Sequence, residues 1–189
     1  KKIANQNIVL LADLVTSKTP LIGVEPSAIL TFRDEYKDLA LPENKAKALA
    51  LSKNTFTVEE FLANAFRNQQ IDVNLFTTAT KQIKIHGHCY QKALSSQEDL
   101  QVMLSIPVNY QTSLIASGCC GMAGSFGYEK EHFEVAQQIG ELVLFPEVRN
   151  ASTTTLIAAS GTSCRHQIKD GTGKQALHPV QILWEALRS

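Results

Sequence analysis

Short apolar segments alternate with segments of helical periodicity along the whole chain, and this alternation constrains the fold more than any other feature. Alternating strands and helices are typical of α/β domains built on a mostly parallel sheet. Ligands of such sheets bind just beyond the carboxyl ends of the strands. We therefore predict an α/β fold of mostly parallel sheets flanked by helices, with its chemistry at that edge.

Hydrophobic spacing, turn residues and capping signals place the individual elements. Thr57 and Glu60 form a capping box that opens a helix. The last helix begins at His178 and Pro179, with proline at the first helical position, where it is tolerated. An apolar strand at 21–24, bounded by prolines, is expected to be buried. The other expected elements are strands at 82–86, 113–116 and 154–159, and helices at 2–16, 27–39, 43–51, 95–104 (capped by Ser95) and 131–145.

A weak internal repeat relates two parts of the chain. Residues 19–28 (TPLIGVEPSA) align with residues 155–164 (TLIAASGTSC) at an offset of 136. Both segments run from a strand through a polar turn into a helix, and Ala28 falls where Cys164 falls. We therefore expect two Rossmann-like lobes. Residues 1–55 would hold the end of a first repeat plus a connection, and residues 56–189 a complete second repeat.

Composition excludes several classes of protein. The 18 Lys and Arg residues balance 18 Asp and Glu residues, so tight nonspecific binding of nucleic acid has no electrostatic source. The longest apolar run, 8–12, is far shorter than the roughly 20 residues of a membrane helix. The absence of an initiator Met suggests a piece of a longer protein. Four cysteines are too few for a disulfide scaffold, and we expect a cytoplasmic location, with a peripheral position at the inner membrane face as the alternative.

All four cysteines follow predicted strands and lie in turns with glycine or histidine neighbours. Cys89 follows the tripeptide HGH, Cys119 and Cys120 lie together between two glycines, and Cys164 precedes RH. We expect the four thiols to converge, because these turns would leave one edge of a parallel sheet. Four thiolates suit an iron–sulfur cluster or a tetrahedral zinc ion. The adjacent pair favours the cluster, because one small ion would take both only with strain.

Residues around the cysteines are candidates for a supporting role. Glycines permit close backbone approach, so that amide N–H groups could reach the thiolates. Histidines could donate hydrogen bonds or carry protons, and an arginine could neutralise the charge of a cluster. The alternative for the histidines is structural hydrogen bonding, and the alternative for the arginine is an ordinary surface position. The alternative for the cysteines is packing in the core. No catalytic residue is assigned, because no Ser-His-Asp order, phosphate loop or dinucleotide fingerprint is present. The predicted supporting residues are His86, His88, His166, Gly118, Gly121 and Arg165.

Four segments closely resemble the cysteine-rich CCG domain: HGHCYQKAL (86–94), GCCGMAGSFGYE (118–129), GTSCRHQI (161–168) and EPSA…FRDEY (25–36). That domain ends large FAD-linked oxidases that are fused to iron–sulfur subunits. The family includes D-lactate, glycolate, glycerol-3-phosphate and D-2-hydroxyglutarate dehydrogenases, and heterodisulfide reductase has a related subunit. The resemblance implies a pair of α/β lobes and an iron–sulfur cluster bound by Cys89, Cys119, Cys120 and Cys164.

The resemblance also implies a function and partners. The chain would be the C-terminal electron-transfer domain of an oxidoreductase that acts on a 2-hydroxy acid, and it would be inactive alone. FAD and ferredoxin-like domains would lie upstream in the same polypeptide or complex. Assembly of the chain into a homo-oligomer is an alternative that is left open. The alternatives are a zinc- or thiol-based structural or substrate-binding lobe, and a noncatalytic docking domain.

Three residues depart from the family pattern. Ala28 stands where Cys is usual, Tyr90 stands where His is common, and Gln167 occupies the second cysteine position of a CxxC. The loss at Gln167 argues against the five-cysteine cluster of heterodisulfide-reductase relatives and leaves four cysteines for a simpler cluster. The loss at Ala28 removes a ligand or a nearby thiol.

Overall fold

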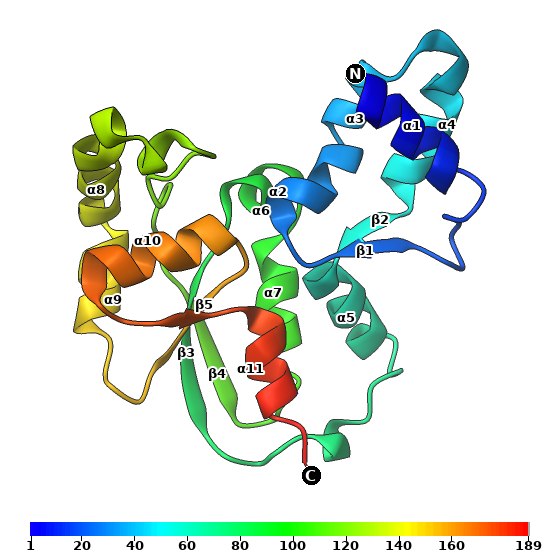
Figure 1. The fold of residues 1–189 in the computed structure, drawn as a ribbon. Coiled ribbons are helices and arrows are strands. Elements are labelled where there is room, and N and C mark those ends of the chain that lie inside the picture. The colour runs from blue at the N-terminus through cyan, green and yellow to red at the C-terminus, as the bar shows by residue number, and fades with distance from the viewer. Residues whose placement is uncertain (189) are drawn as a thin grey trace.

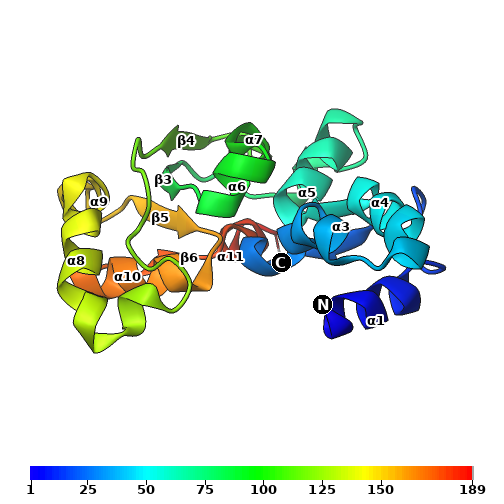
Figure 2. The ribbon, with the colours of Figure 1, turned by 90° about the horizontal axis from the view of Figure 1, so that it is seen from above.

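The computed structural model describes residues 1–188, which form two lobes, each built on a parallel sheet. The small lobe, residues 2–57, carries two strands, and the large lobe, residues 58–188, carries four. The small lobe is blue to cyan in Figure 1, and the view from above shows the two lobes side by side (Figure 2). The predicted α/β class with parallel sheets is confirmed.

The small lobe packs short helices around its sheet. β1 (Leu21–Gly23) pairs in parallel with β2 (Thr55–Thr57), and the buried side chains of Ile8 and Leu51 belong to its core. The helices are α1 (Lys2–Leu11), α2 (Pro26–Ile29), α3 (Glu35–Leu39) and α4 (Lys45–Lys53), with 3-10 turns at Leu30–Phe32 and Pro42–Asn44.

The large lobe carries helices on both faces of its sheet. Ile85 and Ala158 pack with α7 and α11 on one face, and Ile157 and Ala159 pack with α9 and α10 on the other. The strands lie in the order β4 (Tyr110–Leu114), β3 (Lys81–His86), β5 (Leu156–Ala159), β6 (Ala176–Leu177), all parallel. The helices are α5 (Val58–Arg67), α6 (Cys89–Leu94), α7 (Gln97–Leu104), α8 (Phe133–Leu142), α9 (Leu144–Asn150), α10 (Thr162–Thr172) and α11 (Pro179–Glu185), with 3-10 turns at Val73–Leu75, Phe126–Tyr128 and Lys130–His132.

Two predicted helix starts are confirmed. The Glu60 amide donates to the Thr57 hydroxyl at 3.3 Å and the Thr57 amide donates to the Glu60 carboxylate at 2.8 Å, so the capping box of α5 is complete. The His178 ring accepts a hydrogen bond from the Val180 amide at 3.1 Å and caps α11. Both helix starts could be predicted from the sequence because the capping box and the proline signal depend on neighbouring residues only.

The weak repeat has a structural counterpart. β1 ends at Gly23 and β5 at Ala159, and the following helices begin at Pro26 and Thr162, so both boundaries keep the offset of 136. Each of these strands also pairs in parallel with a later strand that leads directly into a capped helix.

Two predicted helices are interrupted. The helix expected over 27–39 breaks into α2, a 3-10 turn and α3, with the non-helical residue Asp34 (φ −116°, ψ −85°) just before α3. The preceding residue, Arg33, forms an ion pair with Glu60 at 2.6 Å. The helix expected over 131–145 ends at Leu142 and restarts as α9. Pro146 explains the restart, because it has no N–H to donate to the Leu142 carbonyl and its ring would clash with that group.

Other boundaries also differ from the predictions. The helix expected over 2–16 ends at Leu11. Ser96 rather than Ser95 caps α7, because the Ser95 hydroxyl donates to Glu60 at 2.7 Å. β1 is not buried as expected, since its sheet has two strands and Ile22 is 38% exposed. Among residues 1–188, no helix combines the length and the apolar character needed to cross a membrane.

Candidate functional site

Three turns meet at the carboxyl edge of the large sheet, because β3, β4 and β5 are parallel neighbours. The turn after β3 leads to Cys89 at the start of α6, the loop after β4 carries Cys119 and Cys120, and the turn after β5 leads into α10 with Cys164 in its first turn. A cavity of about 510 Å³ lies between them. It is lined by Ser27, His88, Cys89, Tyr90, Cys119, Cys120, Ala123, Gly124, Ser163 and Cys164.

The four sulfur atoms form a continuous series of contacts, and all four cysteines are free thiols. Cys89 Sγ donates to Cys119 Sγ at 3.6 Å, Cys119 also contacts Cys120, and Cys120 contacts Cys164. Exposure falls along this series: Cys89 is exposed, Cys119 is half-buried, and Cys120 and Cys164 are 2% and 1% exposed. The structure thus brings the four predicted cysteines together in one place.

Mutual hydrogen bonding separates the pKa values of these thiols. Hydrogen bonds from Cys120 and Cys89 hold the pKa of Cys119 far below its usual range. A hydrogen bond from Cys120, helped by His86, lowers the pKa of Cys164 to about 5 although burial opposes this. The pKa values of Cys89 and Cys120 are raised, first of all because their thiols are the donors to Cys119. Thiolates at Cys119 and Cys164 are the forms that bind metals.

His86 is the last residue of β3 and His88 lies just after it, but the two side chains have different surroundings. His86 is fully buried, and its Nδ1 lies 2.8 Å from the Ser117 hydroxyl, whereas its Nε2 has no hydrogen-bond partner among the described residues. A ring nitrogen of His86 and the sulfurs of Cys120 and Cys164 lie within 4.8 Å of one another. His88 lines the cavity and caps α6, because its Nδ1 accepts from the Tyr90 amide at 3.2 Å.

The two predicted glycines have different roles in the loop after β4. Gly121 has a φ of 101°, and a Cβ there would collide with the Ala136 carbonyl. Its amide donates to Cys119 Sγ at 3.3 Å, which stabilises the thiolate. Gly118 has open space around its α-carbon, and its carbonyl accepts from Lys92 Nζ at 2.6 Å.

Arg165 and His166 lie outside the lining of the cavity. The Arg165 guanidinium donates to the carbonyls of Ala159 at 2.9 Å and Ser160 at 2.6 Å, at the end of β5. The exposed His166 lies 3.0 Å from the Tyr128 hydroxyl through its Nδ1. The geometry therefore gives these two residues structural partners in place of the cysteines.

Sequence reasoning missed Lys92 and Glu25. Lys92 Nζ donates to the carbonyls of Ser117 and Gly118, just before the vicinal cysteines, and its charge lowers the pKa of Cys89 against the larger opposing effects. Lys92 lies one helical turn after Cys89, which is the sequence signal that could have found it. Glu25 reaches from the small lobe and accepts from the Thr162 amide at 2.9 Å, which no local pattern could reveal.

The departures from the family pattern occupy three different places. Tyr90 lines the cavity and donates its hydroxyl hydrogen to Glu35 at 2.7 Å. The buried Gln167 donates to the Ala136 carbonyl of α8 at 3.0 Å. Ala28 is exposed on α2, next to the cavity-lining Ser27.

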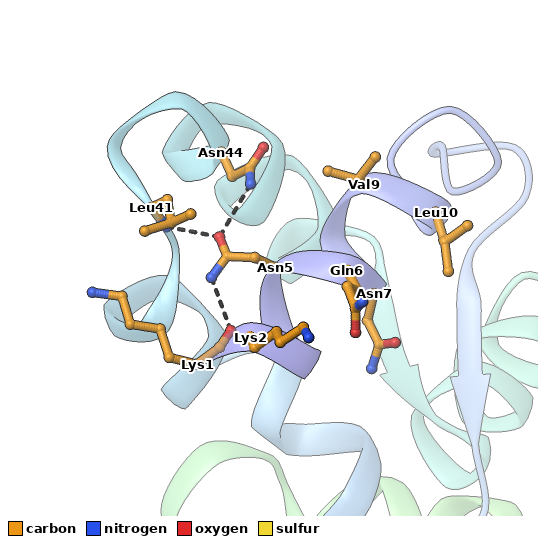
Figure 3. A pocket seen from close by; sticks show the side chains of 9 residues that line it. All are labelled: Lys1, Lys2, Asn5, Gln6, Asn7, Val9, Leu10, Leu41 and Asn44. Carbon is orange, nitrogen blue, oxygen red and sulfur yellow. Dashed lines mark hydrogen bonds between the residues drawn. The ribbon is translucent and has the colours of Figure 1, made fainter.

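A second cavity, of about 990 Å³, lies on the small lobe beside α1. Figure 3 shows Asn5 among its lining residues, with the amide oxygen accepting from the Leu41 amide at 2.8 Å and from Asn44 at 3.1 Å. Among residues 1–188, no cysteine, histidine or carboxylate lines this cavity. The candidate site is therefore the cysteine cavity, which carries the reactive side chains.

Comparison with known proteins identifies relatives of the whole chain. D-2-hydroxyglutarate dehydrogenase of Escherichia coli (strain K12) is 31% identical over 170 residues, which are 89% of this chain and 16% of that protein. The Haemophilus influenzae protein of the same name is 30% identical with the same coverage. A subunit of the anaerobic glycerol-3-phosphate dehydrogenase of E. coli K12 is 25% identical over 99% of this chain and 46% of its own length.

The chain thus spans less than half the length of these relatives. No family model and no solved structure matches it. The resemblance recognised from the cysteine motifs is nevertheless confirmed by relatives that align along most of the sequence. This chain is therefore a homologue of one part of the D-2-hydroxyglutarate dehydrogenases and of a subunit of the anaerobic glycerol-3-phosphate dehydrogenase.

Proposed function

We propose that this chain is the iron–sulfur-binding, electron-transfer domain of a larger FAD-linked oxidoreductase that acts on a 2-hydroxy acid. The observation that carries the proposal is the convergence of four free thiols in one cavity at the carboxyl edge of the sheet. The name D-2-hydroxyglutarate dehydrogenase supports a 2-hydroxy acid as the substrate, and the glycerol-3-phosphate dehydrogenase supports only the broader class of alcohol oxidation. FAD and ferredoxin-like domains of the same protein or complex are the proposed partners, and the cytoplasm is the proposed location.

The donor set fits an iron–sulfur cluster. Cys89, Cys119, Cys120 and Cys164 would hold it, and low pKa values at Cys119 and Cys164 keep two of the ligands ready as thiolates. When bound, such a cluster supplies a one-electron carrier whose potential depends on charge, hydrogen bonds to sulfur and exposure. The Gly121 amide donates to Cys119 Sγ, and the Lys92 ammonium bonds the Gly118 carbonyl just before the vicinal pair. Both groups would stabilise negative charge on the cluster and its thiolates.

The test is anaerobic reconstitution of the chain with iron and sulfide. We expect a brown protein with about four irons per chain. Cys119→Ser should lose most of the iron, because Cys119 contacts both neighbouring thiols. Ser163→Ala is the matched control, since Ser163 lines the same cavity without a thiol, and it should bind iron normally. A colourless, iron-free wild-type protein would contradict the proposal.

A zinc site is the second candidate, favoured by the buried group of His86, Cys120 and Cys164. One histidine with two cysteines is a known donor set for zinc. Metal analysis separates the two candidates, because a zinc protein would contain zinc without iron or acid-labile sulfide. A purely docking role predicts instead that Cys119→Ala leaves the activity of the full-length enzyme intact.

A further inference from the structure

His86 is a buried base with an unused nitrogen. Its side chain is 0% exposed at the end of β3, the central strand that pairs with β4 on one side and β5 on the other. The Ser117 hydroxyl lies 2.8 Å from Nδ1, whereas Nε2 is buried and has no nitrogen or oxygen partner in the described part of the chain; the ring also lies beside the Cys164 sulfur. Buried polar atoms without partners are rare in proteins and indicate an ion or water that the chain itself does not supply.

The surroundings of His86 show what kind of partner this is. A ring nitrogen of His86 and the sulfurs of Cys120 and Cys164 lie within 4.8 Å of one another, and all three residues are at most 2% exposed. The other two cysteines differ, because Cys89 is exposed and Cys119 is half-buried. The thiols therefore divide into a deep pair beside an imidazole and a rim pair near solvent.

We propose that His86 is a direct metal ligand through Nε2, which makes the deep half of the site a mixed nitrogen–sulfur set of His86, Cys120 and Cys164. The inference rests on the proposed function only in requiring that the site holds a metal. A histidine that binds a metal usually donates its other N–H to a neighbouring acceptor, which fixes the tautomer. The Ser117 hydroxyl lies where it can accept that hydrogen from Nδ1. Imidazole and thiolate together suit zinc, cobalt and iron.

The other histidines near the site lack these features. His88 uses its Nδ1 as the cap of α6. His166 is exposed, bonds to Tyr128 and does not line the cavity, although it lies on the same helix as Cys164. His166 is therefore a matched control, and His88 is the competing source of an imidazole ligand.

The experiment loads the metal-free chain with Co²⁺ under anaerobic conditions and records cobalt X-ray absorption. We expect the outer-shell scattering of one imidazole in the wild type and in His166→Gln, and its loss in His86→Gln. Competition titration should show Co²⁺ affinity reduced by at least about 100-fold in His86→Gln and by about 10-fold in Ser117→Ala, which keeps the imidazole but removes the group that orients it. Circular dichroism of the metal-free variants checks that each is folded.

Several outcomes would overturn the inference. They are an absence of Co²⁺ binding, Co²⁺ binding without imidazole scattering, and loss of the imidazole signal in His88→Gln in place of His86→Gln. A folding defect in His86→Gln does not hide the answer, because the wild-type spectrum shows whether an imidazole is bound and the spectra of His88→Gln and His166→Gln show whether one of those two residues supplies it.

A second readout separates this inference from the proposed function. After reconstitution with iron and sulfide, electron paramagnetic resonance of the reduced protein should show hyperfine coupling to a ligand nitrogen that His86→Gln abolishes. Iron and sulfide without nitrogen coupling, together with no imidazole on cobalt, would leave the proposed function intact and refute the role of His86. Imidazole on cobalt without any iron uptake would support the role of His86 as a metal ligand and refute the proposed iron–sulfur function.

Discussion

At the residue scale, one backbone position governs the shape of the loop that carries the vicinal cysteines. Gly121 combines a φ of 101° with an α-carbon that faces the Ala136 carbonyl. We expect Gly121→Ala to lower the free energy of unfolding by about 1–3 kcal/mol, because the substitution adds backbone strain and a collision of the new Cβ with the Ala136 carbonyl. Urea unfolding measures the loss.

Gly118→Ala provides the control for that prediction. Gly118 belongs to the same loop, but a Cβ there would meet no atom within 4 Å. Its free energy of unfolding should change by less than about 0.5 kcal/mol. Equal effects of the two substitutions would show that the loop has no special requirement at Gly121.

At the scale of elements, helix α10 is capped by a carboxylate from the other lobe. Burial raises the pKa of Glu25, but hydrogen bonds from Thr162 and Ser27 outweigh it and bring the pKa below its usual value of 4.5. A lowered folded-state pKa stabilises the protein above pH 4.5, and that stabilisation is lost as the pH falls through the folded-state pKa. We expect Glu25→Gln to cost about 1 kcal/mol at neutral pH.

The measurement is urea unfolding as a function of pH. The difference between wild type and Glu25→Gln should be largest at neutral pH and should shrink below pH 4.5. Glu43→Gln, at an exposed residue of the same lobe, should follow the wild-type curve. A difference that stays constant from pH 7 to pH 3 would contradict the capping role.

The elements also show how far the sequence could predict the structure. The capping box of Thr57 and Glu60 and the position of each cysteine after a strand depend on local patterns, and they were predicted correctly. The ion pair of Arg33 with Glu60 and the hydrogen bond of Ser95 to Glu60 depend on partners distant in the chain, and local propensity could not reveal them. The convergence of the thiols followed from strand topology, but the orphan nitrogen of His86 required coordinates.

At the scale of the whole molecule, a nearly buried ion pair joins the two lobes. Arg33 of the small lobe forms a bidentate pair with Glu60 of α5 and also donates to the Leu94 carbonyl at 3.0 Å. We expect Arg33→Ala to lower the free energy of unfolding by about 3–5 kcal/mol, because it leaves the Glu60 carboxylate, 9% exposed, without its charge partner. Chemical denaturation measures this change.

Lys84→Ala is the control for the ion pair between lobes. Lys84 pairs with Glu147 at the same distance of 2.6 Å, but the two side chains are 30% and 47% exposed. Its removal should cost less than about 1 kcal/mol, since water screens the pair. A similar cost for both substitutions would mean that Arg33 does not hold the lobes together.

The bond from Glu25 to Thr162 spans 137 positions of sequence. Contacts between such distant residues form slowly, because the entropy of closing the loop is lost before the contact stabilises the chain. The thiols come from three turns of a parallel sheet, so they too gather only after distant strands have paired. We expect the polypeptide to acquire its tertiary structure before any metal or cluster binds. Maturation of this protein would then be the insertion of the metal or cluster into an already folded chain.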